Sequence, residues 1–116
     1  IYCEPQIASF GLTEKQALDQ NINFKVGKFP ISASGKALAL GNPEGLIKII
    51  SEDKFGEIIG VHLIGSEVTE LISELSMTKL LEGTIDEIGW MIHPHPTISE
   101  TIKESALDSF NEAIHI

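Results

Sequence analysis

Two histidines and one glutamate lie within eight positions in the segment of this sequence best equipped for chemistry. The segment reads His93-Pro-His-Pro-Thr-Ile-Ser-Glu100, and its two prolines stiffen the backbone. Histidine is the side chain best matched to proton transfer near neutral pH, and a carboxylate on its far ring nitrogen fixes the tautomer and raises the basicity. His95 and Glu100 are therefore candidates for an acid–base pair.

The same residues also have a purely structural interpretation. Thr97 followed three positions later by Glu100 is a capping-box pattern, in which both side chains bind backbone N–H groups at the start of a helix. Capping boxes are common and catalytic pairs are rare, so spacing alone favours this role and leaves the histidines as solvated loop residues. A metal site is favoured still less, because no third ligand lies at a recognised spacing. Residue spacing thus leaves the site undecided.

The elements that must position this segment are strands early in the chain and helices late. Alternating or continuous apolar residues predict strands over residues 7–12, 22–29, 46–51 and 57–64, the last two joined as a hairpin. Capping-box patterns predict helices that open at residues 13–16, 84–87 and 97–100. Apolar residues at helical spacing predict a further helix between Ser66 and Gly83. Residues 32–45 are expected to be an irregular connection.

Strands gathered early and helices gathered late predict an α+β fold. We expect a two-layer sandwich, in which a small antiparallel sheet is covered on one face by helices. Residues 1–116 are expected to form a single domain, because no composition break divides them. That length is too short for two nucleotide-binding folds, so chemistry with several cofactors must be shared with other chain segments.

Composition narrows the range of partners. Seventeen acidic residues against eight basic ones give a formal net charge of −9, which disfavours nucleic acid and membrane surfaces and favours a basic partner. No apolar run approaches the roughly 20 residues of a membrane span, so a soluble protein is expected, in the cytoplasm or the mitochondrial matrix. Cys3 is the single cysteine, so the chain has no redox disulfide of its own, and we expect this thiol to be a small buried hydrophobe.

Matches along nearly the whole chain favour the chemical interpretation of the motif. The His-Pro-Thr-x-x-Glu core closely resembles the terminal motif of the pyridine-nucleotide disulfide oxidoreductases, and the longer form from His93 is similar to members that oxidise dihydrolipoyl groups. Residues 2–14 are similar to the family's domain opening, residues 35–39 to its loop and residues 60–65 to its central strand. The departures from the family pattern are Cys3, Gln6 and Pro94, none of which changes His95 or Glu100.

The resemblance implies a C-terminal interface domain that supplies half of an active site. His95 is then the acid–base residue that serves the partner subunit's site, and Glu100 orients it. A dihydrolipoyl thiol loses its proton to His95 and attacks a redox disulfide, from which electrons pass to FAD and then to NAD. Pro96 and Thr97 are expected near the partner subunit's flavin, with a cis peptide bond at Pro96 and a trans bond at Pro94.

The resemblance also implies what lies outside this chain. The FAD- and NAD-binding domains are expected to precede residue 1, so the chain alone would bind neither cofactor and would be inactive. The implied partners are a second copy of the subunit, a dihydrolipoyl domain as substrate carrier and the basic subunit-binding domain of an acyltransferase. Trp90, Met91, Ile92 and Phe110 are expected to contribute apolar surface to the symmetric contact.

Two alternatives remain open. One is the interface domain of a glutathione-reductase-like enzyme, which shares His-Pro-Thr-x-x-Glu but less often the first histidine. The other is a stand-alone binding module without a catalytic role. The remaining histidines carry no signal for either: His62, in mid-strand, is expected to be structural, and His115 is expected to be solvated.

Overall fold

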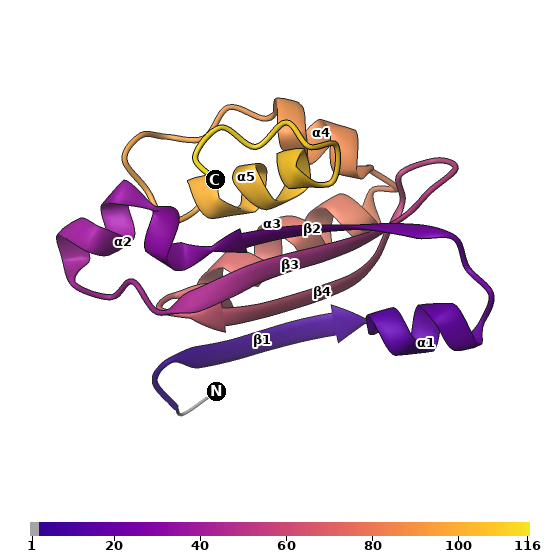
Figure 1. Ribbon diagram of the computed structural model, residues 1–116, viewed down its shortest axis with the longest axis horizontal. Helices are drawn as coiled ribbons and strands as arrows, with labels where there is room; N and C mark the ends of the chain where they lie inside the picture. Colours follow the sequence, from indigo (N-terminus) through magenta and orange to yellow (C-terminus); the bar gives the residue numbers. More distant parts are fainter. Residues whose placement is uncertain (1–2) are drawn as a thin grey trace.

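Four antiparallel strands form one sheet in the order β1-β4-β3-β2 (Figure 1). The computed structural model describes residues 3–116 of the chain. The strands are β1 (Gln6–Gly11), β2 (Phe24–Pro30), β3 (Gly45–Glu52) and β4 (Ile58–Gly65). The β3–β4 hairpin forms the centre of the sheet, while β1 and β2 pair with its outer sides. The predicted strands and hairpin are confirmed.

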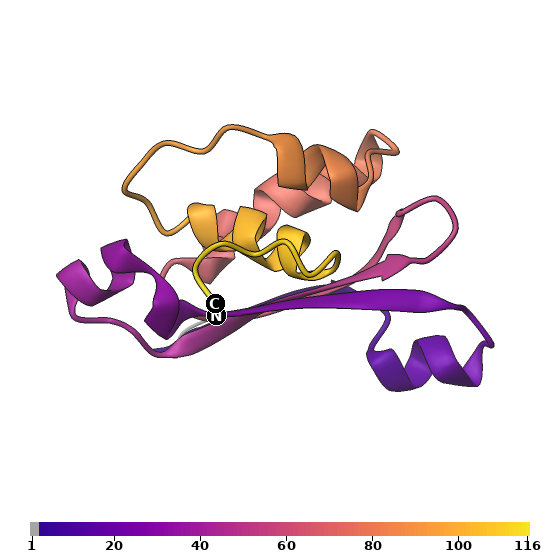
Figure 2. The ribbon, with the colours of Figure 1, turned by 45° about the horizontal axis from the view of Figure 1, so that its top comes forward.

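Three helices cover one face of this sheet, as Figure 2 shows from the side. They are α3 (Val68–Leu80), α4 (Ile85–Trp90) and α5 (Glu100–Asp108). Two short helices, α1 (Glu14–Asp19) and α2 (Gly35–Leu40), lie at opposite ends of the sheet. The predicted two-layer α+β architecture is therefore confirmed. Within residues 3–116, no helix has the length and apolar composition needed to cross a membrane.

The hydrophobic core lies between the sheet and the helices. Alternate residues of the central hairpin point into it, among them Ile47, Ile49, Val61 and Leu63. The helices contribute Leu75, Ile88 and Ile102, and all seven side chains are 2% exposed or less. Burying each such side chain contributes about 1.5–3 kcal/mol. Packing in this core fixes α5 on the sheet, and α5 carries Glu100.

Two of the three predicted capping boxes form as expected. Thr13 and Gln16 cap α1 reciprocally, and Thr84 and Glu87 cap α4. The hydrogen bonds from Thr84 dominate the electrostatics of Glu87 and lower the pKa of that carboxyl. The third prediction is wrong in its position, because α5 begins at Glu100 rather than after Thr97.

The predicted irregular connection over residues 32–45 is also wrong in part. A 3-10 turn at Ile31–Ala33 and helix α2 occupy most of it. Ser34 caps α2 by accepting the N–H of Ala37 at 3.3 Å, and Gly41 ends the helix in the left-handed conformation at φ 75°. Helix α2 has only six residues between Ser34 and Gly41, which is too few to show helical periodicity in the sequence.

Candidate active site

The connection between α4 and α5 presents His95 at the surface. Its side chain is 80% exposed, and its Nδ1 lies 2.9 Å from Oε1 of Glu100, the first residue of α5. The peptide bond between His95 and Pro96 is cis, and Pro94 is not among the cis residues, so both predictions about this loop are confirmed. A second cis bond, before Pro5, was not predicted.

One carboxylate accounts for both sequence-based interpretations of the motif. While Oε1 of Glu100 binds His95, Oε2 accepts the backbone N–H of Thr97 at 2.8 Å. The other half of the capping box does not form: Thr97 Oγ1 donates to the carbonyl of Pro94 at 2.7 Å and lies 2.9 Å from Ser99 Oγ, and the residue before α5 is Ser99. Glu100 therefore orders the loop and orients the imidazole at the same time.

The surroundings of Glu100 favour its ionised form. Partial burial by itself would raise the pKa of Glu100, but the Thr97 N–H, the hydrogen bond with His95 and the charges of His95 and His115 outweigh it and lower this pKa. An ionised carboxylate holds the ring proton of His95 on Nδ1. Nε2 is then free to exchange a proton with a group from outside the domain.

Pro96 and Thr97 fit a contact with a flavin better than a binding site for one. Both hydrogen-bond donors of Thr97 are engaged within the loop, and proline has no N–H to offer. What remains toward solvent is the exposed proline ring next to the imidazole. These residues can line the edge of a bound flavin, but they do not form a phosphate cradle.

A second histidine–carboxylate pair lies behind the loop. His93 Nε2 is 2.8 Å from Oε1 of Glu74 on α3, and the His93 side chain is only 2% exposed. The capping-box interpretation alone would leave His93 as a solvated loop residue, whereas its side chain is buried. No spacing rule connects residues that are 19 positions apart in sequence, so the pair could be found only in three dimensions.

A third pair ties the last described residues to α5. Glu104, with a side chain 7% exposed, accepts the backbone N–H groups of Ile114 and His115 at 2.9 and 3.1 Å. Its other oxygen lies 3.1 Å from His115 Nδ1. His115 and His95 line the same small hollow. His115 is thus largely exposed, as predicted, but it is anchored rather than free.

Of the other single-residue predictions, some are confirmed and some are wrong. His62 is structural as expected, because its Nε2 lies 3.0 Å from the carbonyl of Leu12 and links β4 to the end of β1. Cys3 is exposed, not buried, since it precedes β1 and no element covers it. Phe110 packs against the core, whereas Trp90 is 74% exposed.

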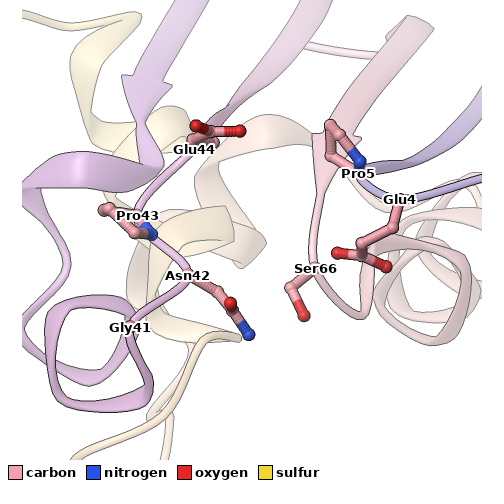
Figure 3. Close-up of a pocket in the computed structure, with 7 residues that line it drawn as sticks. All are labelled: Glu4, Pro5, Gly41, Asn42, Pro43, Glu44 and Ser66. Carbon is pink, nitrogen blue, oxygen red and sulfur yellow. The ribbon is translucent and has the colours of Figure 1, made fainter.

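A separate pocket of about 250 Å³ lies where the loops before β1, β3 and α3 meet (Figure 3). Its polar lining includes Glu4, Asn42 and Ser66. None of its lining residues belongs to the His95 loop. Among residues 3–116, no group of three or more His, Cys, Asp or Glu side chains could hold a metal ion.

Residues 1–106 match the family model described as pyridine nucleotide-disulphide oxidoreductase, dimerisation domain. The chain is 49% identical to the dihydrolipoyl dehydrogenase of Bacillus subtilis over 99% of its length, which is 24% of that protein. It is 46% identical to the enzyme of Rhizobium etli over 98% of the chain and 24% of the relative. It is 40% identical to the mitochondrial dihydrolipoyl dehydrogenase of Pisum sativum over 100% of the chain and 23% of that protein.

Solved structures show the same fold. LpdA from Mycobacterium tuberculosis superposes with a TM-score of 0.83 at 21% identity, covering 90% of this chain and 23% of that one. The HOCl-induced flavoprotein disulfide reductase RclA from Escherichia coli superposes with a TM-score of 0.82 at 24% identity. That superposition covers 86% of this chain and 23% of the RclA chain. The chain therefore spans about a quarter of the length of the relatives it matches.

Proposed function

Because the chain belongs to the pyridine nucleotide-disulphide oxidoreductase family as its dimerisation domain, we propose that it completes the active site of a dihydrolipoyl dehydrogenase. His95 is the acid–base residue, and Glu100 is the residue that orients it. The observation that supports this most strongly is an exposed imidazole whose Nδ1 is held by a carboxylate at 2.9 Å, with Nε2 left free.

The chemistry assigned to the pair is a proton transfer. His95 Nε2 takes the proton from a dihydrolipoyl thiol, and the resulting thiolate attacks a disulfide in another part of the enzyme and displaces one of its sulfurs. The ionised Glu100 stabilises the imidazolium that forms, as a carboxylate does behind other catalytic histidines. FAD, when bound by the rest of the enzyme, accepts the electrons and passes them to NAD.

The partner that this site requires is a second copy of the subunit. Exposed apolar side chains occur where α3 and α4 end: Leu80, Leu81, Trp90 and Ile92 are 76%, 72%, 74% and 90% exposed. We name these four residues the apolar edge, and propose that the second copy covers it. Ile92 is three residues from His95, so such a contact brings His95 close to the partner subunit. Met91, which is 40% exposed, fits the same contact, whereas the buried face of Phe110 does not.

The dihydrolipoyl branch of the family is favoured over a glutathione-reductase-like enzyme. Relatives named dihydrolipoyl dehydrogenase are 40–49% identical over nearly the whole chain, and His93 is present and paired. A stand-alone binding module is disfavoured, because residues 1–106 match the dimerisation domain of an oxidoreductase family. The further partners that we propose are a dihydrolipoyl carrier domain and a basic subunit-binding module. The proposed location of the enzyme is the cytoplasm or the mitochondrial matrix.

The test uses the full-length enzyme that contains this domain. His95→Gln removes the base, so the rate of dihydrolipoamide oxidation should fall by about 10²–10⁴-fold. Glu100→Gln should cost less, because the base remains. NADH-driven reduction of ferricyanide needs the flavin but no thiol deprotonation, so it should persist in both variants.

His62→Gln is the matched control, since His62 is also a histidine held by a hydrogen bond, to the carbonyl of Leu12, but lies away from the loop. Its rate of dihydrolipoamide oxidation should match that of the parent enzyme. Turnover near the parent rate in the His95→Gln enzyme would refute the assignment.

A further inference from the structure

We propose that His93 is a positioning residue for His95: through its bond to Glu74 it holds the α4–α5 connection in the form that presents the catalytic imidazole. This inference rests on the proposed function of His95. His93 itself does not reach the reacting atoms, because its side chain is 2% exposed and turned toward α3.

The bond between His93 and Glu74 is the link between the loop and the helical layer behind it. Within residues 3–116, it is the one side-chain hydrogen bond that ties residues 92–97 to α3. The other side-chain bonds of the loop, from His95 and Thr97, stay within the loop or reach the start of α5. Without the Glu74 contact, no side-chain hydrogen bond in the described residues would join the loop to α3.

A displacement of His93 would be passed on to His95 with little loss. Only Pro94 separates the two histidines, and its ring restricts φ to about −65°. The carbonyl of Pro94 is also fixed, because it accepts the hydroxyl of Thr97 at 2.7 Å. The backbone between the buried His93 and the exposed His95 is therefore short and conformationally restricted, so the two residues move together.

Packing alone does not explain a histidine at this position. With the proton on Nε2, the ring donates to Glu74, and Nδ1 is left buried without a hydrogen-bond partner in the described structure. Burying an unpaired polar atom is unfavourable, and an apolar side chain of similar size would avoid that penalty. What the histidine adds is the directional bond to Glu74, which fixes where the loop lies.

The experiment compares His93→Ala, Glu74→Ala and the double variant in the full-length enzyme, with His62→Ala as the matched control. Each single change should lower kcat for dihydrolipoamide oxidation by up to about 10²-fold, the cost of misplacing a catalytic group by about 1 Å. KM, NADH-driven ferricyanide reduction and the oligomeric state should be unchanged. The double variant should be no worse than the single ones, since the two residues act as a unit.

A conservative variant keeps the test decisive even where alanine impairs folding. The amide of His93→Gln can still donate to Glu74, so this enzyme should retain more kcat than His93→Ala. Equal kcat in His93→Ala and parent, with His95→Gln inactive, would overturn the positioning role and leave the proposed function standing. Parallel loss of both activities in His93→Gln would likewise overturn it in favour of a general folding role. An active His95→Gln enzyme would instead overturn the proposed function itself.

Discussion

At the scale of single residues, Glu100 meets two demands with one carboxylate. Its oxygens divide between the imidazole of His95 and the backbone N–H of Thr97. Helix geometry and proton chemistry therefore impose requirements on the same side chain. A substitution at residue 100 changes the loop as well as the histidine.

The lowered pKa of Glu100 makes a prediction about stability against pH. A carboxyl group whose folded-state pKa is depressed stabilises the fold above its unfolded pKa, and that contribution is lost as the pH falls through the folded value. The usual value is 4.5, so the contribution of Glu100 to the free energy of unfolding, measured as the difference between parent and Glu100→Gln, should be present above about pH 4.5. It should shrink below about pH 4.5. Urea denaturation at a series of pH values measures it, and a difference that stays flat down to pH 3 would contradict the hydrogen-bond assignment.

Residue-scale features were predictable only where the partners are close in sequence. His95 and Glu100 are five positions apart, so both the acid–base pair and the capping box could be proposed from spacing. Neither interpretation excluded the other, because a carboxylate has two oxygens. The pairing of His93 with Glu74, and the backbone anchors on Glu104, depend on how helices pack and have no local signal.

At the scale of elements, α5 owes its position to a close approach to β2. Gly27 lies under the helix, and a Cβ at this position would overlap the backbone carbonyl of Ser105. The hydroxyl of Ser105 reinforces the contact by donating to the carbonyls of Gly27 and Ile47 at 3.0 and 3.3 Å. The sheet thus holds the helix that begins with Glu100.

Gly27→Ala should therefore destabilise the domain. The added methyl group pushes α5 away from the sheet, and overpacking of this kind costs about 1–3 kcal/mol. Gly35→Ala is the matched control, because no atom lies within 4 Å of the corresponding Cβ position and the residue starts helix α2. Thermal denaturation should show a lower Tm for the first variant only; equal Tm values would mean that the helix shifts without cost.

Elements were predicted where the apolar pattern runs long enough. The four strands and the helices α1, α3 and α4 have either clear periodicity or a complete capping box. Helix α2 was missed because six residues do not span two turns. The start of α5 was placed too early because the hydroxyl of Thr97 binds Pro94 instead of capping the helix.

At the scale of the whole molecule, the apolar edge predicts how two copies meet. Ile92→Lys or Leu80→Glu should place an unpaired charge in the subunit contact and shift the full-length enzyme toward monomer. Leu18→Lys is the control, because Leu18 is 65% exposed on α1, which lies across the sheet from the layer of α3 and α4 (Figure 2). Sedimentation velocity distinguishes these outcomes. If both edge variants remain dimeric, the apolar edge is not the subunit interface.

The net charge of −9 predicts how salt affects a basic partner. Attraction between opposite patches speeds encounter and sets orientation, and it is screened beyond about 8 Å at physiological ionic strength. Binding of a basic subunit-binding module to the full-length enzyme should therefore weaken as salt is raised. Calorimetric titration across a salt series tests this. Affinity that does not depend on salt would leave the acidic residues with a solubilising role only.

The anchor on Glu104 makes the segment that follows α5 a suitable place for a spectroscopic label. Two of its bonds come from backbone N–H groups, which every residue except proline supplies. In a variant that lacks the exposed Cys3, the side chain at position 115 can thus be exchanged for a cysteine-linked fluorophore while the backbone remains docked. Because position 115 shares a hollow with His95, the fluorophore would report changes around the imidazole without touching the motif.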